Sequence, residues 1–198
     1  METPTKRKDI PPQRRAQILE AAAGLFSRGG YQGVTVDAIA RRAEISKGNL
    51  YWYFSSKREI FQLLFDDIFE RFSSPVQKII EGEEPPRQKL RALTRTLLEI
   101  AEANPEAIYL ILQIAAQPEL REMVSSEYSQ LMRRYIDFVT PLFTAMGEEK
   151  PEDTAIVYVA ILDALMALVV MGPDIYDRER IVAVLEGRFI SFGREKDV

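Results

Sequence analysis

Six residues between positions 46 and 52 are of types suited to contact with nucleic acid: Ser46, Lys47, Gly48, Asn49, Tyr51 and Trp52. A lysine ammonium binds a phosphate or a base edge, an asparagine pairs with a base edge or caps a helix, and a glycine lets a duplex approach the backbone. Tyrosine and tryptophan donate hydrogen bonds to phosphates and pack against sugars or thymine methyl groups. Leu50 and Phe54, four residues apart, take the opposite face. Residues 47–54 therefore predict a helix with an apolar inner face and an outer face that suits DNA.

The residues just before this helix predict a second helix that would hold it in a helix-turn-helix. Thr35 is a suitable N-cap, the residues after it carry an apolar stripe, and Glu44-Ile45-Ser46 forms the turn. In such a motif the second helix lies in the major groove and the first crosses the backbone. Because helix N-termini attract anions, we expect phosphate contacts at Thr35 and at Lys57, which begins the next helix.

The charge of the chain is divided unevenly. Residues 1–58 contain eleven Lys and Arg against five Asp and Glu, a charge of +6, although the whole chain is −4 and residues 59–198 are therefore −10. This asymmetry favours a nucleic-acid-facing segment attached to a body that does not face nucleic acid. The chain has no Cys and no His, so it lacks the commonest acid–base group and metal ligand, and we expect no metal and no cofactor.

The rest of the chain predicts an all-α fold. Apolar residues recur at helical spacing, Pro and Gly punctuate the helices, and no long stretch alternates with period two. Ser56 and Glu59 form a capping box at the start of a long helix rich in phenylalanine, which we interpret as a connector. The predicted organisation is a basic arm (1–11), a helix-turn-helix domain (12–56), a connector helix (57–82) and a helical body (83–198).

One segment, residues 155–171, has a single charge, Asp163, among apolar residues. A membrane span needs about 20 such residues, and a charge at its centre is costly. We therefore expect a helix buried on nearly all sides of a cytoplasmic protein, with no membrane partner. Asp163 needs a partner itself: it could face a dimer axis, which we favour, pair with an arginine or select a cationic ligand.

Residues 30–57 resemble the N-terminal signature of the tetracycline-repressor (TetR) family of bacterial regulators. The resemblance rests on Gly30-Tyr31, Thr35, Ile39-Ala40, Ala43, the run Ser46 to Phe54 and Lys57, and it extends over about residues 12–65. Two residues depart from the family pattern. Glu44 stands in the turn where glycine is usual, and Tyr53 stands where histidine is frequent.

This resemblance implies a homodimer that binds a palindromic double-stranded DNA operator and is released by a small apolar or amphipathic molecule. It also implies a ligand pocket in the body, for which the candidate residues are Phe69, Leu97, Ile108, Leu112, Tyr128, Tyr135, Phe138 and Tyr158. The last two helices carry excess apolar surface, so the expected dimer interface contains Ala160, Asp163, Ala164, Ala167, Ile181, Leu185 and Phe189.

Three other interpretations remain at this point. The protein could be a helix-turn-helix activator or a DNA-organising protein without a ligand, which a fully packed body would favour. It could be a module that binds only proteins. A helical enzyme would have to use carboxylates such as Asp66, Asp67 and Glu70, which have no histidine partner in this chain.

Overall fold

A computed structural model describes residues 10–190, and over this range the chain contains helices and no strand. The helices are α1 (Pro12–Gly33), α2 (Val36–Arg42), α3 (Lys47–Tyr53), α4 (Lys57–Glu81), α5 (Pro86–Ala103), α6 (Pro105–Ala116), α7 (Pro118–Ala145), α8 (Pro151–Met171), α9 (Arg178–Leu185) and a π-helical turn, Glu186–Ile190. The all-α prediction is confirmed. The predicted arm lies almost entirely outside the described residues.

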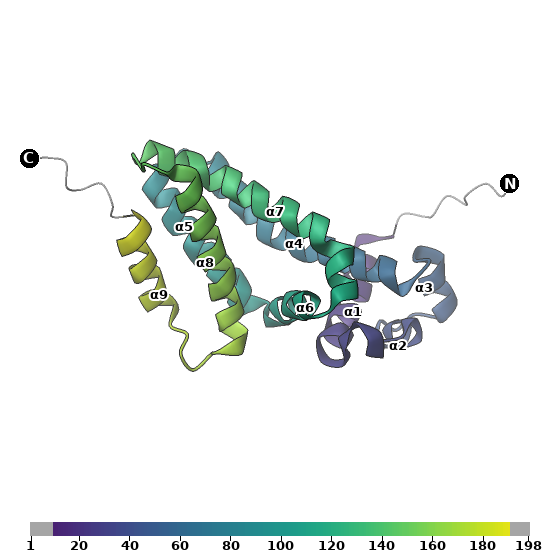
Figure 1. Cartoon of the computed structure of the whole chain (residues 1–198). Coiled ribbons are helices and arrows are strands. Elements are labelled where there is room, and N and C mark those ends of the chain that lie inside the picture. The colour runs from purple at the N-terminus through teal and green to yellow at the C-terminus, as the bar shows by residue number, and fades with distance from the viewer. Residues whose placement is uncertain (1–9, 191–198) are drawn as a thin grey trace, which may run out of the picture.

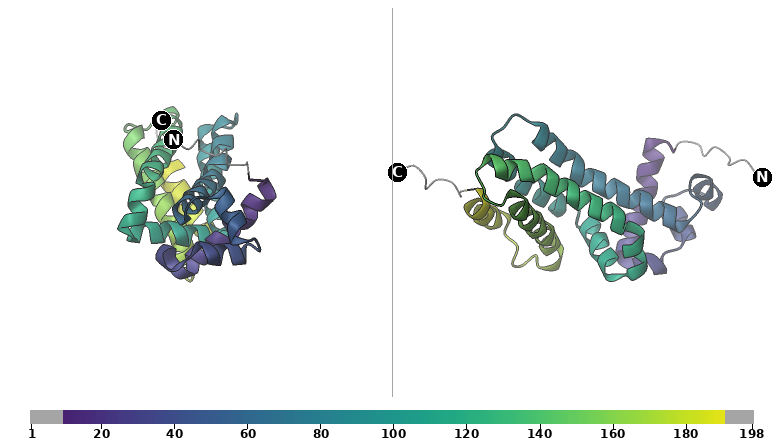
Figure 2. Two further views of the ribbon diagram at one scale, coloured as in Figure 1. Left: turned by 90° about the vertical axis from the view of Figure 1, so that its right-hand side faces the viewer. Right: turned by 45° about the horizontal axis from the view of Figure 1, so that its top comes forward.

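The helices form a small unit at one end of an elongated body (Figure 1). The unit contains α1, α2 and α3, and α4 runs from it into the body, where α4 and α7 lie side by side (Figure 2). Helices α5, α7 and α8 complete the body, and α6 lies between the body and α1. The position of α3 therefore depends on two helices, α4 and α6, that also belong to the body.

The short helices begin at capped N-termini, as the sequence predicts. Hydroxyl oxygens accept backbone N–H groups at Thr35 (from Ala38, 3.1 Å) and at Ser46 (from Asn49, 3.1 Å). At α4 the Ser56 hydroxyl accepts the Glu59 amide, while the Glu59 carboxylate reaches back to the amide of Ser55 rather than Ser56. Each cap satisfies a donor that the helix cannot pair internally, which fixes where the helix starts.

An aromatic series connects the core of the small unit to the body. The Phe61 ring, near the start of α4, contacts Phe26 at 5.5 Å and Tyr31 at 5.1 Å between ring centroids. Phe61 stacks on Phe65 at 6.4 Å, and Phe65 contacts Phe69 at 4.0 Å. Such pairs are favourable beyond their burial, so the start of α4 is firmly packed against α1.

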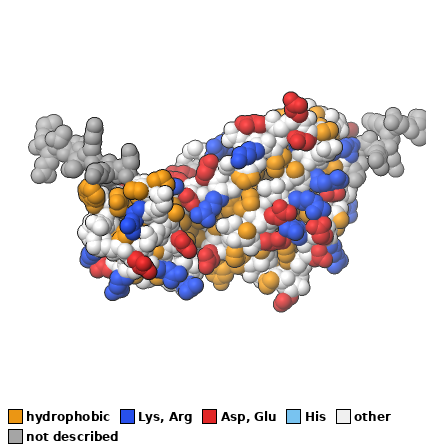
Figure 3. Space-filling model, turned by 180° about the vertical axis from the view of Figure 1, so that it is seen from behind, with side chains coloured by type: hydrophobic (Ala, Val, Ile, Leu, Met, Phe, Trp, Pro, Cys, Tyr) orange, Lys and Arg blue, Asp and Glu red, His pale blue; other side chains and the backbone are white. Residues whose placement is uncertain are grey.

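Helix α9 is attached to α5 by paired charges. Arg91 contacts Glu186 at 2.7 Å, Arg95 contacts Glu179 at 2.9 Å, and Arg178 contacts Glu102 at 2.9 Å. In the view from behind, acidic and basic side chains lie next to each other at the end of the body that carries α9 (Figure 3). Because exposed ion pairs are each worth about 0–1 kcal/mol, the buried Val182 and Leu185 supply most of the attachment.

Helix α8 differs from its prediction. By length and composition it is the one helix in residues 10–190 that could cross a membrane, but it packs on α5, α6 and α7 as a core helix does. Only 28% of its most apolar stretch is buried within the chain, although we expected burial on nearly all sides. Helix α8 therefore has one covered face and one apolar face that the rest of residues 10–190 leaves open.

The turn between α2 and α3 is strained at Glu44. Its φ is 51°, and it is the one residue other than glycine with positive φ in residues 10–190. A side chain in this left-handed region crowds the backbone and costs about 1–2 kcal/mol. The family pattern has glycine at this position, where no such crowding arises.

We expect Glu44→Gly to raise the free energy of unfolding by about 1 kcal/mol, because glycine adopts positive φ without a steric penalty. Thermal unfolding should shift upward by about 2–4 °C. Glu44→Ala is the matched control, since it removes the charge and keeps the crowding. Equal effects of the two substitutions would show that the charge, not the backbone, determines the change.

Candidate DNA-binding surface and ligand cavity

Helix α3 divides its side chains between two faces. Leu50 is fully buried, whereas Tyr51 and Trp52 are 47% and 49% exposed. Lys47, Gly48 and Asn49 are exposed on the same outer surface, and Tyr53 is half-buried. Large exposed aromatic rings on a short capped helix are a costly arrangement in water, so this surface is suited to a partner.

Lys47 already has a partner in the structure. Its ammonium lies 2.9 Å from the Asp37 carboxylate of α2 and 5.9 Å from the centre of the Tyr51 ring. The hydrogen bond and the charge of Asp37 raise the pKa of Lys47. The pair links α2 to α3 and holds the lysine over the outer face, where a phosphate or a base edge would compete with Asp37 for it.

Gly48 faces open space. An added β-carbon there would meet no atom within 4 Å. Packing within the chain therefore does not require glycine at this position, and close approach by a partner is the remaining physical reason for it.

Lys57 has partners within the chain. The sequence predicts that its ammonium binds a phosphate; in the structure it donates to the carbonyl oxygens of Tyr31 at 2.8 Å and Val34 at 3.0 Å. It also lies 4.3 Å above the Tyr31 ring, and burial lowers the pKa of Lys57. The reason lies in α1: Gly30 leaves the helical conformation (φ 65°, ψ 167°), so carbonyls after it need donors from elsewhere.

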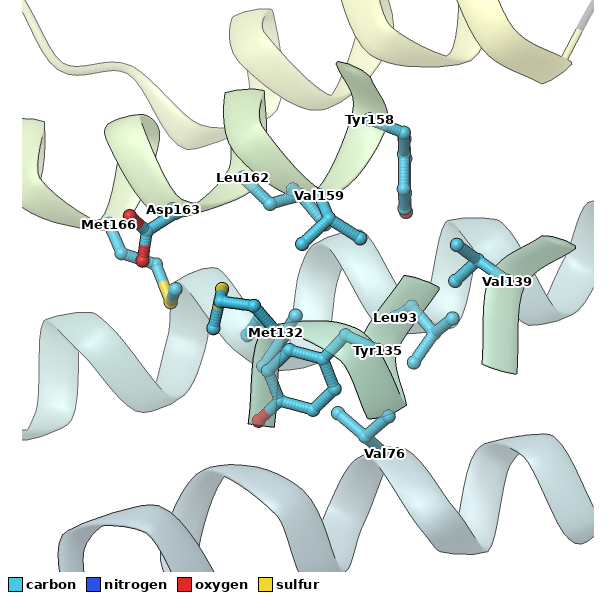
Figure 4. Close-up of a pocket in the computed structure, with 11 residues that line it drawn as sticks. Val76, Leu93, Met132, Tyr135, Val139, Tyr158, Val159, Leu162, Asp163 and Met166 are labelled. Carbon is cyan, nitrogen blue, oxygen red and sulfur yellow. The ribbon is translucent and has the colours of Figure 1, made fainter. Parts of the chain in front are cut away.

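The body contains two adjoining apolar cavities. The first lies among α4, α5, α7 and α8 (Figure 4), and the second, with about 600 Å³ of empty space that is partly open to solvent, reaches α6. Four residues line both cavities: Met132, Tyr135, Asp163 and Met166. The two spaces are therefore parts of one region, separated by side chains that include two flexible methionines.

Seven of the eight predicted pocket residues line this region: Phe69, Leu97, Ile108, Leu112, Tyr128, Tyr135 and Tyr158. Phe138 lines neither cavity. The sequence analysis missed Phe72, Met132 and Met166. The sequence could have indicated two of them, because Met132 is one helical turn after Tyr128 and Met166 is one turn after Asp163, so each shares a helix face with a candidate residue.

Asp163 has a partner within the chain. We favoured a position on the dimer axis; in the structure its carboxylate accepts a hydrogen bond of 2.9 Å from the Tyr128 hydroxyl of the same chain and lines both cavities. Burial raises the pKa of Asp163, against the opposing effect of that hydrogen bond. Tyr158, in contrast, is fully satisfied by Thr94 (2.8 Å) and the Leu90 carbonyl (3.1 Å).

The residues predicted for the dimer interface fall into two groups. Ala160 and Ala164 are exposed on α8, while Ala167 and Ile181 are half-buried. Leu185 is buried within the chain, and the half-buried Phe189 packs against Phe143 and Tyr158. The sequence analysis missed four exposed apolar residues, Ile156, Val157 and Met171 of α8 and Val184 of α9.

Comparison with known proteins places this geometry in a family. Residues 18–64 match the family described as bacterial regulatory proteins, tetR family, and residues 107–189 match the tetracyclin repressor-like, C-terminal domain. The chain is 26% identical to the HTH-type transcriptional regulator YhgD of Bacillus subtilis over 87% of its own length and 93% of that protein.

Two solved structures extend the likeness. A TetR-like transcriptional regulator from Rhodococcus sp. RHA1 is 26% identical and superposes with a TM-score of 0.74, over 91% of this chain and 95% of that one. FadR from Bacillus subtilis, solved in complex with stearoyl-CoA, has the same fold at 20% identity, with a TM-score of 0.72 over 89% and 97% of the two chains.

The three-helix unit with its exposed α3 and the helical body define a helix-turn-helix transcriptional regulator, a class of DNA-binding protein and not an enzyme. The chain belongs to the TetR family, because both its N-terminal and its C-terminal parts match that family.

We expect Gly48→Ala to weaken DNA binding at least about tenfold, because the new methyl group would stand where the duplex approaches α3. The free protein should unfold at an equal or slightly higher temperature, since alanine favours helix and has room here. Gly187→Ala is the control, as its added β-carbon also meets open space but lies in the body. Unchanged DNA affinity in Gly48→Ala, measured by fluorescence anisotropy, would exclude close approach at this position.

We also expect Asp163→Asn to unfold at a higher temperature than the wild type at neutral pH. The folded-state pKa of Asp163 is raised above 3.8, so its ionised form destabilises the folded state. The wild type should regain this stability as pH falls through the raised pKa, and the difference should vanish near the ordinary pKa of aspartate. Thermal melts of both proteins across this pH range provide the measurement; a difference that grows toward low pH would contradict it.

Proposed function

We propose that this protein is a dimeric repressor that binds a palindromic operator in the cytoplasm and releases it when a small apolar or amphipathic molecule enters the body. Residues 12–56 bind DNA, residues 57–82 connect, and residues 83–198 hold the ligand and dimerise. The observation that carries this proposal is the aromatic series along α4, because Phe61 packs in the DNA-binding unit and Phe69 lines the cavity.

A second link supports the same coupling. Helix α6 lines the cavity with Ile108, Ile111 and Leu112. On its other side the Gln113 side chain donates a hydrogen bond of 2.8 Å to the Ser27 carbonyl near the end of α1. A ligand that pushes α4 and α6 apart would therefore reorient the DNA-binding unit through both helices. Coupling free energies between two sites in a protein are typically about 1–3 kcal/mol.

The DNA contacts follow from the outer face of α3. The residues best placed for base edges are Lys47, Gly48 and Tyr51. The DNA phosphate backbone would be contacted by Asn49, Trp52 and the helix N-termini that Thr35 and Ser46 cap. Two half-sites would lie about 34–36 Å apart, which demands a two-fold dimer. In this proposal Lys57 stabilises the junction of α1 and α4 and does not contact DNA.

The open face of α8 is the proposed dimer interface. Its apolar side chains recur at helical spacing along the whole helix, in the order Ile156, Val157, Ala160, Ala164 and Met171. The two alanines allow a second copy of α8 to approach closely, and Val184 of α9 extends the surface. Burial of this face would complete the covering of α8.

The operator experiment tests the function directly. Purified protein should protect a palindrome in DNA upstream of its own gene, and one compound from a panel should remove the protection. An alternative activator or DNA-organising role without a ligand predicts protection that no body-binding compound changes. If saturating amounts of every compound that binds the body leave operator affinity unaltered, the proposed switch is wrong.

We expect Val157→Glu to raise the dimer dissociation constant at least about a hundredfold, because two-fold symmetry introduces the charge twice into one apolar interface. Operator affinity should fall in parallel, while the helical content of the monomer stays unchanged because Val157 is exposed in the single chain. Sedimentation or light scattering gives the mass. Tyr109→Glu, at an exposed ring on α6, is the control and should leave the mass unaltered.

A further inference from the structure

The ligand cavity contains a carboxylate that no cation neutralises. Asp163 has one hydrogen-bond partner, the Tyr128 hydroxyl at 2.9 Å, and within residues 10–190 no Lys or Arg forms an ion pair with it. Placing a carboxylate among apolar side chains without a positive partner is costly. Because the described residues supply no positive partner, a cation from outside the chain would offset this cost.

The groups facing Asp163 reinforce this conclusion. From α4, α5 and α6 only apolar side chains line the two cavities. From α7 come Tyr128 and Tyr135, whose pKa values are both raised by burial, so both are neutral hydroxyls. Arg134, also on α7, is exposed, lines neither cavity and acts to lower the pKa of Tyr135. The cavity is therefore negative at Asp163 and uncharged elsewhere.

Four aromatic rings surround the same space. Phe69 and Phe72 of α4 and Tyr128 and Tyr135 of α7 line the wider cavity together with Asp163. Aromatic faces attract cations, and rings combined with an acid bind ammonium groups. A free carboxylate in a ligand would gain nothing from the rings and would be repelled by Asp163.

Tyr135 adds an unused polar group. Its side chain is 6% exposed and its hydroxyl has no hydrogen-bond partner in the described part of the chain, although it lines both cavities. Figure 4 shows Tyr135 of α7 and Asp163 of α8 among the same lining side chains. A buried hydroxyl without a partner costs about 1–3 kcal/mol, so a ligand that supplies one gains affinity.

We propose that the cavity binds an amphipathic cation. Its ammonium group lies against Asp163 among the aromatic rings. Its apolar chain extends past Met132 and Met166 from one cavity into the other. Where the ligand has a further polar atom, that atom forms a hydrogen bond with the Tyr135 hydroxyl. This inference rests on the proposed function, because it assigns a chemical class to the effector of the same site.

The test compares three probes of equal chain length on the purified full-length protein without DNA. Decyltrimethylammonium, decanol and decanoate are titrated by calorimetry below the concentrations at which they form micelles. We expect the cation to bind at least about tenfold more tightly than the other two, since charge-assisted contacts in a desolvated site are worth that much. Comparable affinity for decanol or decanoate would overturn the proposal without any substitution being made.

Asp163→Asn provides the second arm. It keeps the shape of the side chain and removes its charge, so the affinity for the cation should fall at least about tenfold while that for decanol stays within about twofold. Asp137→Asn, an exposed residue on α7, removes the same charge outside the cavity and should change neither affinity. Retained preference for the cation in Asp163→Asn would show that the ammonium group binds elsewhere.

Measurements of operator binding in the presence of each probe then test the ligand class and the release by ligand independently. If the cation binds in an Asp163-dependent way and operator DNA stays bound, the ligand class stands and release by ligand is wrong. If decanoate or decanol releases the operator and the cation does not bind, the switch stands and the ligand class is wrong.

Discussion

The arrangement of this protein depends on how tightly α4 is packed at its start and along its first half. At one end Phe61 contacts Phe26 and Tyr31, and the Lys57 ammonium is bonded to two carbonyls beside them. Further along, Phe69 lines the cavity. Because close-packed interiors transmit displacement rather than absorb it, a ligand of the proposed kind would act on the unit that carries α3 through a shift at Phe69. The bonds of Lys57 lie at the same junction and link the end of α1 to the start of α4.

Helix α8 explains why one segment looks apolar all round. Its inner face forms the wall of the cavity and holds Asp163 toward Tyr128, and its outer face exposes Val157 and Ala160. Because both the cavity face and the outer face of α8 are apolar, the helix has no polar stripe, and its sequence pattern therefore resembles that of a membrane span. Ala164 and Ala167 also line the cavity, so the ligand and the proposed partner would touch opposite sides of the same thin wall.

Contacts between residues a few positions apart could be predicted from the sequence, whereas contacts between residues far apart in the sequence could not. The caps at Thr35, Ser46 and Ser56 and the two faces of α3 follow from spacing over a few residues, and the structure has them. The bonds of Lys57 to residues 31 and 34 depend on how Gly30 ends α1, which spacing does not reveal. Likewise, Leu185 and Phe189 share a stripe with Ile181, but only the packing of α9 on α5 shows that they point inward.

The outer face of α3 is too small to specify an operator by itself. Lys47 is shared with Asp37, Ser46 is committed to its cap, and few side chains remain for base edges. Each such contact discriminates by about 1–3 kcal/mol, so in the proposed dimer a second copy at a fixed distance would supply the rest. Within one chain, α4 and the hydrogen bond from Gln113 to Ser27 connect the cavity to the DNA-binding unit. In the proposed mechanism a small change in the cavity would therefore alter the separation of two α3 helices, the quantity on which specific DNA binding would depend.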